Sequence, residues 1–69
     1  MTTKSFLLTV IELNRQHLLR GDITPEEAFQ DIQHHINLAY YEYINGNGKP
    51  IDKRDMLHKA FVMLAKVTK

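Results

Sequence analysis

The sequence contains no cysteine and no tryptophan, and its only serine is Ser5, close to the N-terminus. Without cysteine there is no disulfide and no thiolate metal ligand. The absence of cysteine fits a reducing compartment, so we expect a cytoplasmic protein. A chain with no cysteine nucleophile and a single serine near its end is poorly equipped for nucleophilic catalysis. We therefore expect that it is not an enzyme.

Long hydrophobic runs are also missing. The apolar stretch near the N-terminus is interrupted by Glu12, Asn14 and Arg15, and no basic segment precedes it, which argues against a signal peptide or membrane span. The 69 residues predict a single helical domain, 1–69. A chain this short buries only about 60% of its unfolded surface. Because that leaves a small core, we expect self-association as a dimer or higher oligomer.

Positive charge is absent from the middle of the chain. Residues 23–46 contain four acidic residues and no lysine or arginine, whereas residues 47–69 contain six basic residues and two aspartates. The net charge is only +1, so the total charge selects no partner. The acidic middle and the basic end can pair inside the fold, or they can form a polarised surface that steers a partner or a second copy.

Capping residues mark the helices. Thr24, Pro25 and Glu27 form a T-x-x-E capping box with proline at the first helical position. Gly46 is placed to end that helix in a left-handed conformation. Neither proline nor glycine occurs in the interior of the predicted helices before and after this one. We predict an all-α, compact three-helix domain with helices at about 3–20, 25–45 and 52–68.

Apolar residues recur at intervals of three and four, which places them on one face of each predicted helix. In the first helix the expected inner face is widened at its edges, and in the third two methionines lie beside it. The residues expected to face the core are Leu7, Val10, Ile11 and Leu18, with Phe6, Leu13 and Leu19 at the edges; Phe29, Ile32, Ile36, Ala39 and Tyr43; and Leu57, Ala60, Phe61, Leu64 and Val67, with Met56 and Met63 beside them.

The stretch 39–44, AYYEYI, admits another interpretation, because tyrosine and isoleucine favour strands and the following Asn-Gly favours a hairpin. No partner strand follows, since the segment after the two Asn-Gly pairs, KPID, is too short and contains Pro50. The cap at Thr24 and the unbroken helical period favour a helix here.

Two D-x-x-H patterns, Asp31 with His34 and Asp55 with His58, are weak candidates for a metal site. A carboxylate and a histidine three residues apart share one face of a helix, as in the E-x-x-H pairs of di-iron bundles. These side chains are expected to lie off the apolar faces and to face solvent. Only an interface between chains would bring the two pairs together, so we expect no metal and no cofactor.

Three apolar residues outside the expected core are interface candidates. Leu38 and Tyr41 fall on the outer face of the second helix, and Val62 lies outward between Lys59 and Lys66 on the third. Aromatic side chains concentrate at binding hot spots. Scattered exposed apolar residues are also normal on any protein surface, so the pattern is equally consistent with an ordinary surface.

Basic residues follow the loop NGNGKPID. Lys49, Lys53 and Arg54 lie beside the start of the third helix, and Lys59 and Lys66 follow on it. This arrangement suits phosphate or nucleic-acid contact. No G-x-x-x-x-G-K-[ST] motif is present, so the loop is not a P-loop.

We therefore expect a protein-interaction module, a regulator, inhibitor or adaptor that binds a macromolecular partner, with no membrane contact. Very small cysteine-free helical chains of this style include accessory proteins of phages and plasmids, which is an association with a class of proteins. The alternative is a nucleic-acid or nucleotide binder that uses the basic loop and the third helix, and a steep salt dependence of binding would favour it.

Overall fold

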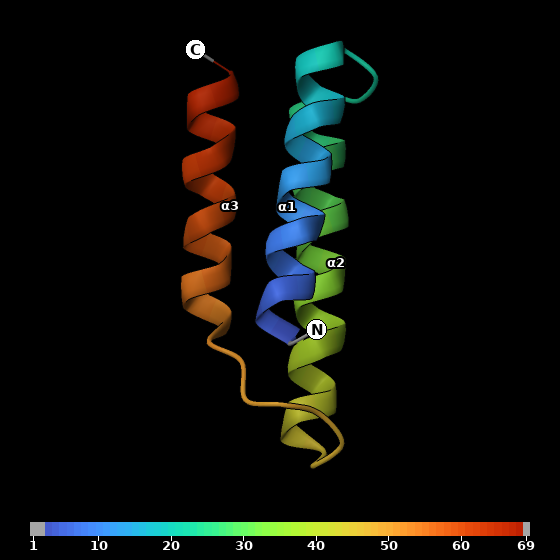
Figure 1. The fold of residues 1–69 in the computed structure, drawn as a ribbon, viewed down its shortest axis with the longest axis vertical. Coiled ribbons are helices and arrows are strands. Elements are labelled where there is room, and N and C mark those ends of the chain that lie inside the picture. Colours follow the sequence, from blue (N-terminus) through green and yellow to red (C-terminus); the bar gives the residue numbers. More distant parts are fainter. Residues whose placement is uncertain (1–2, 69) are drawn as a thin grey trace.

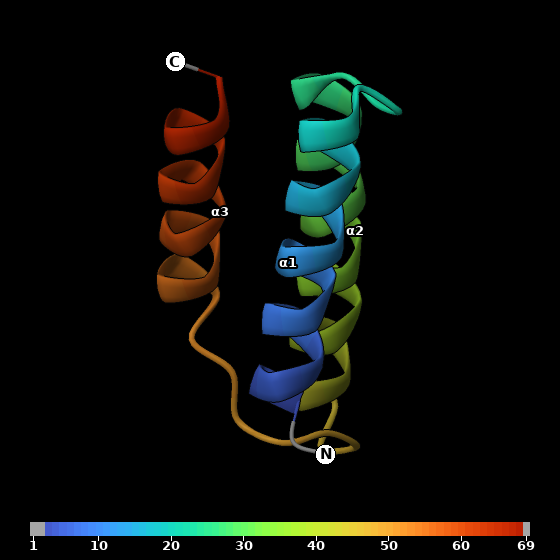
Figure 2. The same ribbon diagram turned by 45° about the horizontal axis from the view of Figure 1, so that its top comes forward.

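The computed structural model describes residues 3–68, which form three helices and no strand (Figure 1). The helices are α1 (Thr3–Arg20), α2 (Pro25–Ile44) and α3 (Lys53–Val67). The predicted all-α three-helix fold is confirmed, and each helix end lies within one residue of its predicted position. The helices run along the long axis of a molecule of 38 × 18 × 18 Å, with α2 antiparallel to both α1 and α3 (Figures 1 and 2).

Side-chain caps fix where α2 and α3 begin. The Thr24 hydroxyl accepts a 3.1 Å hydrogen bond from the Glu27 amide, and the Thr24 amide donates to the Glu27 carboxylate at 3.0 Å. This is the predicted capping box, and it satisfies two amides that have no partner within the helix. At α3 the Asp52 carboxylate accepts from the Asp55 amide at 3.0 Å. Both helices therefore start at residues that the sequence marks.

Glycines in the left-handed conformation end α1 and α2. Gly21 has φ +79° and Gly46 has φ +80°. The amide after each glycine bonds back into the last turn, from Asp22 to the His17 carbonyl at 3.0 Å and from Asn47 to the Glu42 carbonyl at 2.9 Å. This is the Schellman arrangement, in which glycine avoids the clash that a Cβ would cause at positive φ.

The core lies between the three helices and is small. It is built from aliphatic and methionine side chains that all three helices contribute. Its buried members are Leu7, Val10 and Ile11 from α1, Ile32 and Ile36 from α2, and Met56, Ala60 and Met63 from α3.

The prediction was wrong for several residues expected to face the core. Phe61 is 56% exposed, because α3 is turned so that Met56, Ala60 and Met63 face α1 and α2. Tyr43 is exposed because α2 continues beyond the adjacent ends of α1 and α3 (Figure 1). The residues expected to widen the inner face of α1 are exposed as well: Phe6, Leu13 and Leu19.

None of the helices in residues 3–68 combines the length and the apolar character that crossing a membrane requires.

Candidate interaction surface

A polar contact joins α1 to α2 beside the core. Asn14 is 6% exposed, and its amide nitrogen donates to the Val10 carbonyl at 2.9 Å and to the Asp31 carboxylate at 2.8 Å. Asp31 is exposed, as expected, and one of its carboxylate oxygens also reaches α1 to accept this hydrogen bond, which the sequence did not predict. Since a buried amide needs partners, the Asp31 carboxylate serves the fold at this position.

The histidines of α2 lie beside this contact. The Nδ1 atom of His35 is 2.8 Å from the Asp31 carbonyl oxygen, and its ring packs 5.8 Å from the ring of Phe6. His34 is exposed, and its ring meets that of His35 edge-on at 5.7 Å. A hydrogen bond to a backbone carbonyl fixes the orientation of the His35 ring.

The two D-x-x-H pairs lie on different helices. Asp31 and His34 belong to α2, whereas Asp55 and His58 belong to α3. Between Thr3 and Thr68, no group of three or more histidine, cysteine, aspartate or glutamate side chains is arranged to hold a metal ion. His58 is exposed, and the carboxylate of Asp55 accepts a 2.7 Å hydrogen bond from Lys59.

The ion pair of Asp55 and Lys59 alters the charge pattern expected for α3. The hydrogen bond from Lys59 lowers the pKa of Asp55 below its ordinary value of 3.8, with the positive charge of Lys59 adding to the effect. The charge of Lys59 is thus partly neutralised by Asp55 on the same helix, so Lys59 attracts an oppositely charged partner less strongly than an unpaired lysine would. Lys66 has no acidic partner among residues 3–68 and keeps its full charge at the surface.

The three interface candidates are all exposed. Leu38 and Tyr41 lie one turn apart on α2 with exposed fractions of 51% and 61%, and Val62 on α3 is 38% exposed. Leu38 and Tyr41 form one patch, since residues three apart are neighbours on a helix surface. Val62 belongs to a separate surface on α3, beside Phe61.

Phe61 is the one phenylalanine of α3, and it is exposed. Its ring stacks on Phe29 of α2 with centroids 5.0 Å apart and an angle of 27° between the planes. Stacked aromatic pairs contribute about 0.5–1.5 kcal/mol beyond the area that they bury. More than half of Phe61 still faces water, so the pair leaves an apolar surface open where α2 and α3 meet.

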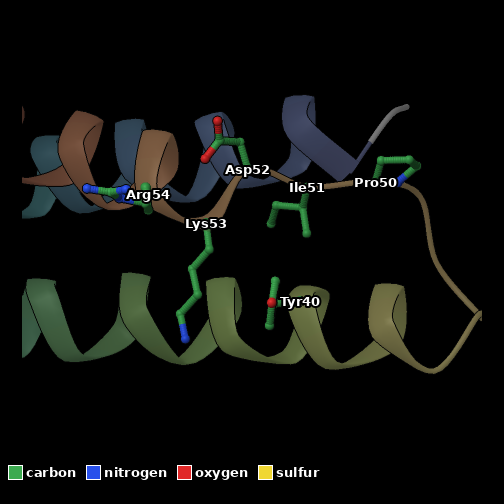
Figure 3. Close-up of a pocket in the computed structure, with 6 residues that line it drawn as sticks. All are labelled: Tyr40, Pro50, Ile51, Asp52, Lys53 and Arg54. Carbon is green, nitrogen blue, oxygen red and sulfur yellow. The ribbon is translucent and has the colours of Figure 1, made fainter.

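A hollow of about 630 Å³ opens to solvent between α2 and the chain that enters α3 (Figure 3). Figure 3 shows Tyr40 and Ile51 facing one another across it, with Lys53 reaching toward α2 and Arg54 pointing away. The Lys53 ammonium lies 5.2 Å from the centre of the Tyr40 ring, a cation–π distance. The residues that line the hollow are Tyr40, Pro50, Ile51, Asp52, Lys53 and Arg54.

The structure brings two of the five basic candidates together at this hollow, Lys53 and Arg54. Lys49 precedes the hollow in the chain, whereas Lys59 and Lys66 lie further along α3. The amide at the start of α3 is already bound by the Asp52 carboxylate, so this helix end offers less to a phosphate than a free one would.

Sequence reasoning missed the roles of Asn14, Tyr40 and Ile51. The role of Asn14 could have been found in the sequence. Asn14 lies four positions after Val10 and so falls within the apolar stripe, where a polar side chain requires a buried partner. Tyr40 lies at the edge of the stripe of α2, and nothing in the sequence says which loop residue it meets. The hollow forms only because the connection from α2 to α3 folds back along the bundle (Figure 1).

Comparisons of the chain with protein-family models, with curated proteins and with solved structures find no match.

Proposed function

We propose that this protein is a small, non-enzymatic interaction module that self-associates, binds a macromolecular partner and acts as a regulator, inhibitor or adaptor. The observation that carries the proposal is the pair of exposed apolar residues one turn apart on α2, Leu38 and Tyr41. A helix on the surface of a globular protein normally presents polar residues to water, and a helix that is apolar all round is a buried one. α2 buries Ala28, Ile32 and Ile36 and still exposes Leu38 and Tyr41, which fits a helix that is covered by another molecule.

The partner surface that we favour is the patch formed by Leu38 and Tyr41 on α2. Both side chains are more than half exposed. The same helix carries Glu26, Glu27 and Glu42 and no lysine or arginine. An apolar patch on a helix that has no lysine or arginine suits a partner of apolar and basic character, because complementary charge speeds the encounter and selects the partner.

The test is affinity capture with a tagged chain, followed by measurement of binding to the captured protein in purified form. Tyr41→Ala should weaken that binding by about 1–3 kcal/mol, as hot-spot truncations do, and leave the helix content unchanged by circular dichroism. Gln33→Ala, an exposed substitution on the same helix, is the matched control and should bind as the wild type does.

An association constant that Tyr41→Ala leaves unchanged would remove this patch from the proposal. Binding through apolar surface should vary little with salt, because exposed charges contribute little to it.

A nucleic-acid or nucleotide binder is the second candidate, and the hollow beside Tyr40 is the observation in its favour. There the Tyr40 ring lies 5.2 Å from the Lys53 ammonium, a combination suited to a base and a phosphate. Purification without nuclease tests this candidate, since a chain without tryptophan absorbs weakly and bound nucleic acid would dominate at 260 nm. A 260 nm signal that salt removes would place this candidate first.

A further inference from the structure

The side of the bundle where α2 and α3 meet carries an exposed aromatic side chain near one end and a hollow near the other. The exposed side chain is Phe61, which is 56% exposed and stacks on Phe29 of α2. The hollow of about 630 Å³ lies beside Tyr40 of the same helix. Both are open to solvent at the boundary of α2 and α3. We infer that this side is a self-complementary docking surface for a second copy of the chain, in which Phe61 of each copy enters the hollow of the other.

Helix geometry fits such a pair. Tyr40 lies about 16 Å further along α2 than Phe29, at 1.5 Å per residue. A two-fold axis that lies in the plane of this side, at right angles to the helices and midway between these levels, exchanges the two ends and places the two sides face to face. It brings Phe61 of one copy over the hollow of the other, and the same operation forms the second contact. The packing is therefore closed after two chains.

The charges select the antiparallel arrangement. The first turn of α2 carries Glu26 and Glu27 at one end of the bundle (Figure 1). Lys53 and Arg54, at the start of α3, lie toward the opposite end, between Asp52 and an Asp55 whose charge is paired with Lys59. An antiparallel pair places the acidic end of each copy beside the basic end of the other. A parallel pair would place like charges together, which costs binding free energy.

The size of this side also suits a second copy. The molecule measures 38 × 18 × 18 Å, so one long side is comparable in area to the ~800 Å² per partner of a standard interface. The hollow is open, and the apolar part of its lining, Tyr40, Pro50 and Ile51, can pack against an aromatic ring, while Asp52, Lys53 and Arg54 line the rest. This inference rests on the self-association that belongs to the proposed function, and it leaves Leu38 and Tyr41 free for a different partner.

Sedimentation equilibrium of the full chain is the first test. We expect a wild-type dimer of about 16 kDa, twice the 8.1 kDa chain. Phe61→Ala should raise the dissociation constant roughly tenfold or more, as the loss of a central aromatic residue does. Leu13→Ala is the matched control, since it removes a similarly exposed apolar residue of α1, outside the boundary of α2 and α3, and it should leave the dimer intact. Circular dichroism checks that both variants stay helical.

A charge exchange tests the orientation. Glu26→Lys and Arg54→Glu should each weaken the dimer at low salt, and the double variant should recover it because the two charges have exchanged places. The chain has no native cysteine, so a spin label on Arg54→Cys in an unlabelled copy reports on a ¹⁵N-labelled copy. Broadening of the Glu26 and Glu27 amides in the labelled copy supports the antiparallel pair.

Three outcomes overturn the inference: a wild-type chain that stays monomeric at millimolar concentration, a Phe61→Ala variant that dimerises as tightly as wild type, or broadening at the start of α3 in the labelled copy. A monomeric wild type leaves the partner-binding proposal standing, because that proposal is tested separately by Tyr41→Ala against the captured partner.

Discussion

Asn14 of α1 donates a 2.8 Å hydrogen bond to the carboxylate of Asp31 on α2, and its other amide hydrogen is taken by the Val10 carbonyl. Both donors of a nearly buried amide are thus used. Asp31 is half exposed, so water can solvate its remaining oxygen. The contact ties two otherwise apolar helix faces together in one register, because a shift of either helix would leave the buried amide without a partner.

Asn14→Asp should destabilise the fold by about 3 kcal/mol at neutral pH, because it buries a charge against a second carboxylate. The repulsion raises the pKa of the pair in the folded state. Stability is then retained below the unfolded carboxyl pKa of ~3.9 and lost as the pH rises through the raised folded value. Urea unfolding between pH 3.5 and pH 7 measures this dependence. Asn14→Ala is the control and should lose about 1 kcal/mol with little added pH dependence. Equal stabilities of Asn14→Asp at both ends of the range would contradict the contact.

Thr24→Ala should cost about 1 kcal/mol, because it removes the hydroxyl that caps α2. In a domain of this size that loss lowers the melting temperature by about 4–8 °C. Thr9→Ala is a matched control, since the Thr9 hydroxyl bonds only to the Ser5 carbonyl within α1 at an exposed site. Thermal unfolding should leave Thr9→Ala near wild type, and an equal loss in both variants would argue against a specific role of the cap.

Gly46→Ala should cost about 1–2 kcal/mol, because a Cβ is strained at φ +80° even though the space around it is open. Gly46→Asn should cost less, since asparagine tolerates the left-handed conformation. Chemical denaturation of the two variants side by side gives the comparison. If alanine proved as stable as asparagine, backbone strain would not be the reason for glycine here.

The ion pair of Asp55 and Lys59 should make stability fall under acid conditions. The hydrogen bond from Lys59 lowers the pKa of Asp55 in the folded state, so the pair stabilises the fold above the ordinary value of 3.8. That contribution is lost as the pH falls through the lowered folded value. A ¹³C-detected carboxyl titration should give a pKa for Asp55 below 3.8 in the wild type and a higher one in Lys59→Gln. Glu12, whose pKa is lowered by its hydrogen bond with Arg15, is the internal reference and should not change in that variant.

The interface candidates show which surface residues the sequence could predict and which it could not. Helical spacing correctly placed Leu38, Tyr41 and Val62 at the surface, because the direction of a side chain follows from its position in the helix. It could not place Phe61 there, and it therefore missed the stacked pair with Phe29. Whether any of these residues binds a partner is a matter of binding energy, which an exposed fraction does not determine.

The sequence by itself determined the three helices and their ends. The capping box at Thr24, the cap at Asp52 and the left-handed glycines at Gly21 and Gly46 act within a few residues, so they operate whatever surrounds them. Only the tertiary structure decided which way α3 turns. Its stripe of Met56, Ala60 and Met63 and its stripe of Leu57, Phe61 and Leu64 have the same helical spacing and lie close together around the helix. The local pattern allows either stripe to face inward, and the choice depends on how the side chains fit against α1 and α2. That fit buried the methionines, left Phe61 exposed, and brought Ile51 across from Tyr40.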